Sequence, residues 1–174
     1  MISKQEALDF LKELNCPENV IKHCICVSKE AVLIAEAIEE NGISVDVELV
    51  EIGALLHDVG RSISHDIDHA IIGARLVYEA GFDTRLVNIV KKHIGAGLDS
   101  EEAEINGLPP DNYIPETIEE KIVAHADNLF KSSEKITLQR RIEIMKSRGN
   151  SEKAILRTIK LAEEIDEMAS KKTV

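Results

Sequence analysis

Apolar residues recur at helical spacing along almost the whole chain, and this periodicity limits the fold more than any other feature. The clearest case lies between Pro17, which suits the first turn of a helix, and Gly42, which suits the position after its end. Its apolar side chains share one face; they are Val20, Val27, Ala31, Ile34 and Ile38. No alternating stretch is long enough to predict a strand, so the sequence predicts an all-α fold.

The same criteria predict further helices over residues 3–14, 46–58, 68–80, 83–93, 116–131, 136–145 and 151–168. The segment 95–115 differs, because three glycines and three prolines surround a short acidic stretch at 100–105. Glycine and proline at this density indicate a surface loop, and a loop of this length often forms the lid or rim of a site. Without a repeat or linker, the 174 residues are expected to form one domain.

The balance of charge limits the partners of the protein. There are 32 acidic residues against 21 lysines and arginines, which gives a formal net charge of −11. Binding to duplex DNA or RNA needs a basic surface, and single-strand binding uses aromatic platforms, whereas aromatic residues make up only 3% of this chain. We therefore expect no duplex nucleic acid as a partner. A small phosphorylated substrate stays compatible, because it responds to the local field of one pocket.

The sequence also bears on the compartment. Its apolar runs span about five residues, far below the roughly 20 that a membrane-spanning helix needs, so no membrane partner is expected. The first ten residues carry three charged side chains and no apolar signal core. An odd number of cysteines cannot all pair within one chain; these are Cys16, Cys24 and Cys26. We therefore expect a cytoplasmic protein with reduced thiols.

A histidine–aspartate pair, His57 and Asp58, ends the apolar stretch of the helix predicted over 46–58. Such polar side chains are costly to bury without partners, and imidazole and carboxylate are common ligands of divalent metals. One pair cannot complete a coordination shell, so other helices must supply further ligands, as they do in metal sites of helical bundles. The candidates are His23, His69, His93 and Asp127.

The order of His23, the His57-Asp58 doublet and Asp127 resembles the HD-domain superfamily of metal-dependent phosphohydrolases, in which His, His-Asp and Asp lie on helices. The segment 56–60, Leu-His-Asp-Val-Gly, is close to the His-Asp-Ile-Gly variant of that superfamily. The resemblance covers about residues 18–132. It implies an HD-type helical domain with this core, on which C-terminal helices over 133–170 pack.

Two further elements resemble the binuclear members of the superfamily: the run His69–Ala74, with its Gly-Ala ending, and His93. The layout is similar to that of bacterial dinucleoside-tetraphosphate hydrolases, whereas the Gly-Tyr-Pro element of cyclic-di-GMP phosphodiesterases is missing. The resemblance implies two ligand sets, one of His23, His57, Asp58 and Asp127, the other of His69, His93 and the shared Asp58. One or two ions, and Fe, Mn, Co, Ni or Zn, stay open at this point.

The expected reaction is hydrolysis of a phosphoester or phosphoanhydride in a nucleotide or another small phosphorylated metabolite. Two divalent ions about 3.5–4 Å apart clamp a phosphoryl group and activate a water for in-line attack. Fixed cations must then balance charge on the phosphoryl oxygens. Asp58 and Arg61, which follows the doublet closely, are the candidate catalytic residues, and Arg61 is also a candidate phosphate contact. Lys92 and Lys131 are further candidates, with a solvated lysine as the alternative.

Two other functions stay open: a catalytically silent sensor that binds a nucleotide or metal, and a helical interaction protein with incidental histidines. A second pair, His65-Asp66, lies in a polar loop and is expected at the pocket edge or in solvent. His125 is expected to be structural, because residues two apart on a helix point to different sides. The C-terminal helices either close the core or present a homodimer face.

Overall fold

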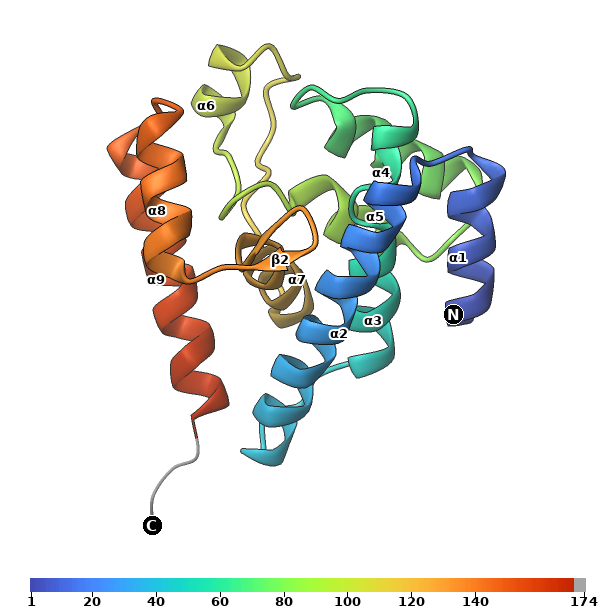
Figure 1. The fold of residues 1–174 in the computed structure, drawn as a ribbon, viewed down its shortest axis with the longest axis horizontal. Helices are drawn as coiled ribbons and strands as arrows, with labels where there is room; N and C mark the ends of the chain where they lie inside the picture. Colours follow the sequence, from blue (N-terminus) through green and yellow to red (C-terminus); the bar gives the residue numbers. More distant parts are fainter. Residues whose placement is uncertain (171–174) are drawn as a thin grey trace.

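The computed structural model describes residues 1–170, and within them α-helices carry almost all of the regular structure (Figure 1). The all-α class predicted from the sequence is confirmed. The elements are α1 (Lys4–Glu13), α2 (Glu18–Glu40), α3 (Val47–Leu56), the 3-10 turn η1 (Val59–Ser62), α4 (His69–Glu79), α5 (Thr84–Lys92), α6 (Ser100–Ile105), α7 (Ile118–Asn128), β1 (Phe130–Lys131), β2 (Glu134–Lys135), α8 (Leu138–Ser147) and α9 (Glu152–Ala169). The domain end predicted at residue 174 lies outside the described residues.

Local capping signals set most helix ends. The Ser3 side chain accepts a hydrogen bond from the Glu6 amide, and the Glu6 carboxylate accepts one from Ser3, so α1 begins with a capping box. Thr117 and Glu120 form the same arrangement at the start of α7. Gly42 follows α2 with φ of +83°, a conformation that glycine adopts without steric cost. These ends lie within a few residues of those predicted.

The central layer of the molecule consists of α2, α3 and α7, which pack on one another; α5 packs on α3 and α7, and α4 packs on α5 and η1 (Figure 1). Helix α9 lies along α7 and α2, and α8 packs on α9. The largest fully buried apolar side chains are Leu11, Val27, Ile38, Ile52, Leu55, Leu56, Leu86, Ile89, Ile122 and Ile165. Each contributes about 1.5–3 kcal/mol by leaving water, so this layer is the rigid base on which polar residues can be held.

Two glycines allow η1 to lie directly against α4. A Cβ atom on Gly60 would sit 1.9 Å from the backbone oxygen of His69 and 2.7 Å from the amide of Gly73. A Cβ on Gly73 would sit 2.9 Å from Val90. Any side chain at Gly60 would therefore push α4 away, so the Asp-Val-Gly run and the later Gly-Ala pair bring the doublet and His69 together.

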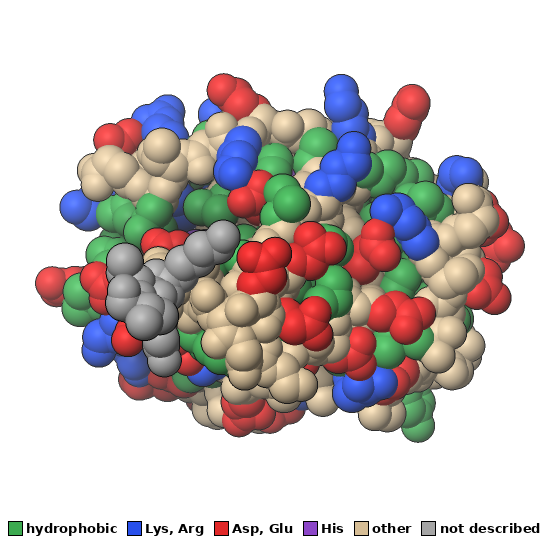
Figure 2. Space-filling model, turned by 90° about the horizontal axis from the view of Figure 1, so that it is seen from below, with side chains coloured by type: hydrophobic (Ala, Val, Ile, Leu, Met, Phe, Trp, Pro, Cys, Tyr) green, Lys and Arg blue, Asp and Glu red, His purple; other side chains and the backbone are tan. Residues whose placement is uncertain are grey.

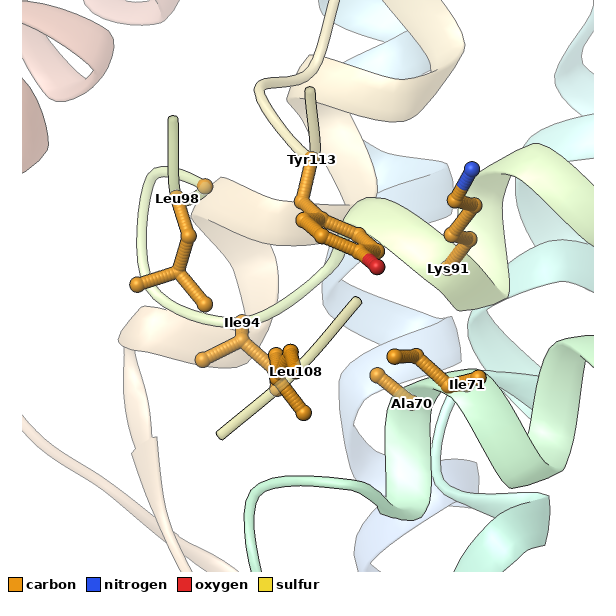
Figure 3. Close-up of a pocket in the computed structure, with 8 residues that line it drawn as sticks. Ala70, Ile71, Lys91, Ile94, Leu98, Leu108 and Tyr113 are labelled. Carbon is orange, nitrogen blue, oxygen red and sulfur yellow. The ribbon is translucent and has the colours of Figure 1, made fainter. Parts of the chain in front are cut away.

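The segment predicted as a loop over 95–115 contains a helix, α6, which corrects the prediction at 100–105. An Asp99–Glu102 capping box starts α6, and α6 buries Ala103 in a small separate apolar cluster with Leu108 and Tyr113. Figure 3 shows Tyr113 and Leu108 over the Ile71 side of α4. The narrow pocket between them has no room for a water molecule, so it is a packing seam.

The structure also corrects the prediction of no strand, because the helix predicted to reach Lys131 ends at Asn128 and a short antiparallel hairpin follows. Ser132 lies at its turn with φ of +55°. The Arg141 guanidinium, from α8, donates to the backbone oxygens of Asn128 and Phe130. The Arg141 side chain thus provides hydrogen bonds to backbone oxygens at the end of α7 that a longer helix would have bonded internally. Sequence periodicity does not reveal such a contact.

Candidate metal centre

Five helices deliver the six predicted metal ligands to one place. His23 lies in the first half of α2, His57 and Asp58 directly follow α3, and Asp127 lies in the last turn of α7. His69 is the first residue of α4, and His93 follows the last residue of α5. These residues form three overlapping groups of three, and within each group the potential ligand atoms lie within 4.8 Å of one another. The structure therefore brings together residues that are up to 104 positions apart in sequence.

Each of the four histidines is fixed by its Nδ1 atom. That atom contacts a backbone carbonyl oxygen, and a carbonyl can only accept, so Nδ1 carries the proton. The Nδ1–oxygen distances are 2.6 Å from His23 to Ser132, 2.7 Å from His57 to Ala54, 2.6 Å from His69 to Asp66 and 2.7 Å from His93 to Val90. In the neutral imidazoles Nε2 is then a bare acceptor, the arrangement typical of metal-binding histidines.

The Nε2 atoms face one another in two pairs. His23 Nε2 lies 3.2 Å from His57 Nε2, and His69 Nε2 lies 3.1 Å from His93 Nε2. Two acceptors at this distance repel unless a cation or a proton lies between them. Ligand atoms 2.0–2.2 Å from one metal ion lie roughly 3–4 Å apart, which matches these separations. The donor set thus fits a divalent metal.

The two aspartates complete the arrangement. Asp58 Oδ2 lies 3.7 Å from His23 Nε2 and 3.8 Å from His57 Nε2, whereas Asp58 Oδ1 lies 3.1 Å from His69 Nε2 and 3.4 Å from His93 Nε2. Asp127 Oδ1 lies 3.0 Å from His23 Nε2 and 3.6 Å from His57 Nε2. One oxygen of Asp58 therefore faces each pair of histidines, and Asp127 faces only the first pair. These groups can hold a divalent metal.

The electrostatics of the two pairs differ. Burial would lower the pKa of His57, but the neighbouring Cys24, Asp58 and Asp127 outweigh burial and hold this pKa well above its ordinary value. Burial would raise the pKa of Asp58 and of Asp127, but the surrounding imidazoles hold both well below the ordinary range. Burial lowers the pKa of His93, despite a hydrogen bond to Asp58. Without metal, a proton on His57 is thus the compensating cation.

Arg61 lies beside the shared aspartate. Its Nε donates to Asp58 Oδ2 over 2.8 Å, and its Nη1 donates to the backbone oxygen of His65 over 3.2 Å. The side chain of Arg61 is partly exposed and lines the adjoining pocket. His65 also lines that pocket, Asp66 is exposed, and His125 is buried. These positions agree with the readings of the second pair and of His125 made from the sequence.

The structure places Lys92, a candidate phosphate contact in the sequence, in two ion pairs outside the pocket. Its ammonium donates to Glu116 over 2.7 Å and to Glu120 over 3.0 Å, and it is not among the residues that line the pocket. Burial would lower the pKa of Lys92, but these two carboxylates outweigh burial and raise it. Both partners lie more than 20 positions later in the sequence, so no local pattern marked Lys92 as paired.

A pocket of about 480 Å³ opens beside the centre and is lined by every candidate ligand except His57. Its walls carry four arginine or lysine side chains. They are Arg61, Lys131, Arg141 and Arg148. Its two carboxylates are Asp58 and Asp127, which face the histidines. A volume in this range accommodates a small organic ligand, and the cations favour an anionic one.

The excess of acidic residues lies elsewhere. Figure 2 looks at the end of the molecule where α2 and α9 finish, and acidic side chains gather on that face with no histidine in view. Exposed acids in these helix ends are Glu36, Glu39, Glu40, Glu163, Glu164, Asp166 and Glu167. The net charge of −11 therefore does not describe the pocket.

Three residues of this region were missed from the sequence: Ser132, Arg141 and Arg148. Ser132 accepts the Nδ1 proton of His23, and the two arginines line the pocket. An arginine on an amphipathic helix carries no signal of its own. The positive φ at Ser132 depends on the hairpin, which the helical pattern obscured.

Sequence comparison identifies relatives of the chain. The HD domain family model matches residues 20–131. The uncharacterized protein MJ0778 of Methanocaldococcus jannaschii is 47% identical over 165 residues, which cover 94% of this chain and 97% of the relative. A tRNA (cytidine(56)-2'-O)-methyltransferase of Thermoplasma volcanium is 47% identical over 146 residues, or 84% of this chain. The chain spans only 42% of that longer protein.

A solved structure shares the fold. The HD domain of the Listeria monocytogenes phosphodiesterase PgpH, in complex with cyclic-di-AMP, matches with a TM-score of 0.58 at 17% sequence identity, covering 95% of this chain and 99% of that one. Within residues 1–170, no helix is both long enough and apolar enough to cross a membrane. The family match covers more than half of the chain, and the helical fold and the histidine–aspartate cluster agree with it. The chain belongs to the HD-domain family of metal-dependent phosphohydrolases.

Proposed function

We propose that the six residues hold two divalent ions, and that the protein hydrolyses a phosphoester or phosphoanhydride of a nucleotide or a related small metabolite. The first set is His23, His57, Asp58 through Oδ2, and Asp127; the second is His69, His93 and Asp58 through Oδ1. When bound, such ions activate water and neutralise phosphoryl charge. Fe, Mn, Co, Ni and Zn all suit this mixture of nitrogen and oxygen ligands.

The observation that carries the proposal is the orientation of the four imidazoles. Each imidazole donates a hydrogen bond from Nδ1 to a backbone oxygen, and its Nε2 atom faces a common centre. Histidines that only stabilise a core would be expected to pair Nε2 with a donor or with water. Here the Nε2 atoms contact one another and the two carboxylates, so a cation is the partner that satisfies all of them.

The pocket supports an anionic substrate at this centre. Arg61 holds Asp58 Oδ2 and also faces the pocket, so it can fix the carboxylate and contact a phosphoryl oxygen. Lys131 adds a second cation near His23, because its neighbour Ser132 bonds to that histidine. The volume suits a nucleotide. The cyclic-di-AMP bound by the PgpH domain, which shares the fold, adds support for a nucleotide.

Phosphate release tests the proposal. The protein is stripped of metal and reloaded with Mn, Fe(II), Co, Ni, Zn or Mg in turn. It is then offered nucleoside mono-, di- and triphosphates, dinucleoside polyphosphates, cyclic dinucleotides and short oligonucleotides. The last are included because one relative is a tRNA methyltransferase. We expect release from at least one substrate by the native chain, and none by Asp58→Ala.

Asp66→Ala is the matched control, since it removes an exposed carboxylate from the second histidine–aspartate pair and leaves the backbone contact to His69 in place. Equal activity of Asp58→Ala and the native chain would refute the assignment of the centre. Tight nucleotide binding with no release under any metal would favour the sensor alternative instead.

A further inference from the structure

The hairpin and α8 form a basic wall on one side of the pocket, made of Lys131, Arg141 and Arg148. Lys131 ends β1, Arg141 lies in the first half of α8, and Arg148 follows its last residue. The hairpin is tied to the metal centre through Ser132 and His23, at 2.6 Å. The wall therefore stands at a fixed place relative to the proposed ligands.

The Arg141 side chain is half-buried, and the groups that bind it do not neutralise its charge. Its guanidinium donates to the backbone oxygens of Asn128 and Phe130, and more weakly to that of Asp127 at 3.4 Å. All three acceptors are neutral carbonyls. The nearest carboxylate, that of Asp127, faces His23 and His57, so it is committed to the centre. The positive charge of Arg141 thus remains available at the pocket surface.

The other two cations have no counter-ion of their own. In the described part of the chain neither Lys131 nor Arg148 makes an ion pair, although Glu134 lies opposite Lys131 in the hairpin. Neighbouring cations outside the pocket are paired: Lys135 with Glu30 at 2.7 Å and Arg140 with Glu143 at 2.8 Å. Lys131 and Arg148, which line the pocket, are thus unpaired. Lys135 and Arg140, which do not line it, are paired.

Charges of the same sign also lie together on this wall. Arg141 and Arg148 both line the pocket, so two guanidinium groups share this wall. Apolar side chains of Phe130, Ile144 and Met145 line the same region and offer no compensation. Two guanidinium groups that repel each other beside an apolar surface would be stabilised by an anion bound between them.

We propose that Lys131, Arg141 and Arg148 form a second anionic subsite, so that the substrate is a nucleotide with at least two phosphate groups. One phosphate lies at the metal centre with Arg61, and another lies on the basic wall. This proposal rests on the proposed function in one respect, which is that the first phosphate lies at the metal centre. The subsite itself requires only that these cations bind the second one.

Two ligands that differ by one phosphate test the subsite. Calorimetry compares the α,β-methylene analogue of ADP, which resists hydrolysis, with AMP, using the Mn-loaded protein. We expect Lys131→Gln and Arg148→Gln each to weaken binding of the analogue about tenfold or more, because each removes a charged hydrogen bond to phosphate. Binding of AMP is expected to change less than about twofold. Arg141 is left intact, because its bonds to the end of α7 hold the hairpin.

Lys146→Gln is the matched control: this lysine is exposed on α8 but does not line the pocket, so both affinities should stay unchanged. The subsite is overturned if Lys131→Gln and Arg148→Gln weaken both ligands equally, or neither. The two proposals fail separately. Selective loss of analogue binding in a protein that releases no phosphate supports the subsite and refutes the hydrolase, whereas hydrolysis with unchanged binding in both variants does the reverse.

Discussion

The His23–His57 half of the centre faces two carboxylates, Asp58 and Asp127, whereas the His69–His93 half faces only the shared Asp58. Side-chain exposure is 12% for His23 and 22% for Asp127, against 5% for His69 and 2% for His93. His69 and His93 nevertheless line the pocket together with His23 and Asp127, so both halves adjoin it, and only His57 does not. The second half contributes two imidazoles and no carboxylate of its own.

The two halves also differ in the pKa of a histidine. The raised pKa of His57 means that this imidazole holds a second proton in the absence of metal. The lowered pKa of His93 means that this imidazole carries no second proton that a metal would have to displace. Asp58 is the only described residue whose two carboxylate oxygens serve both halves. We therefore expect two sites that share Asp58 and differ in metal affinity.

The largest expected effect follows from removal of the common member. Asp58→Ala should abolish binding in both halves, so metal content falls to background and phosphate release falls by more than the roughly 10–100-fold that loss of an outer-shell partner costs. Mass spectrometric metal analysis and the release assay measure both. Retention of one full equivalent of metal by Asp58→Ala would show that the halves are independent.

Variants specific to one half should separate them. Asp127→Ala should lose the metal of the first half and keep that of the second, and His93→Ala should do the reverse. Each variant is then expected to bind one ion per chain with greatly reduced activity. A protein that loses both ions with either variant would indicate a single cooperative site, and one that keeps both would contradict the assignment of these ligands.

Arg61 should affect the halves unequally, because it bonds to Asp58 Oδ2, the oxygen on the first side. Arg61→Gln is expected to weaken metal binding in the first half by roughly 10–100-fold and to spare the second. Arg75→Gln, on the exposed face of α4, is the control. If metal affinity is unchanged but the KM for substrate rises, Arg61 acts on the phosphate alone.

The smallest effect concerns pH. Because the pKa of His57 is raised, metal must displace its proton, and affinity in the first half should fall about tenfold per pH unit below that pKa. Because the pKa of His93 is lowered, a metal need not displace a proton from His93, so the affinity of the second half should fall less steeply with pH. Calorimetric titration of His93→Ala and Asp127→Ala measures each half. Parallel pH profiles would contradict the difference in protonation.

The sequence predicted most of the helices and all six residues that the structure gathers, because caps and helical periodicity are local and the family pattern depends on residue order. It missed what depends on contacts between distant segments. Lys92 could not be recognised as paired without Glu116 and Glu120, and the end of α7 depends on Arg141. The basic wall also depends on how the hairpin and α8 pack, which no motif encodes.

The most direct test of the account is the number of ions that one chain binds. Metal-stripped protein is titrated with Mn²⁺ near neutral pH, and calorimetry gives the stoichiometry and the affinities. The account predicts two ions per chain with distinct affinities, and one remaining ion in Asp127→Ala. A single ion in the native chain that survives His93→Ala unchanged would contradict the second half, and no bound ion would contradict the metal centre itself.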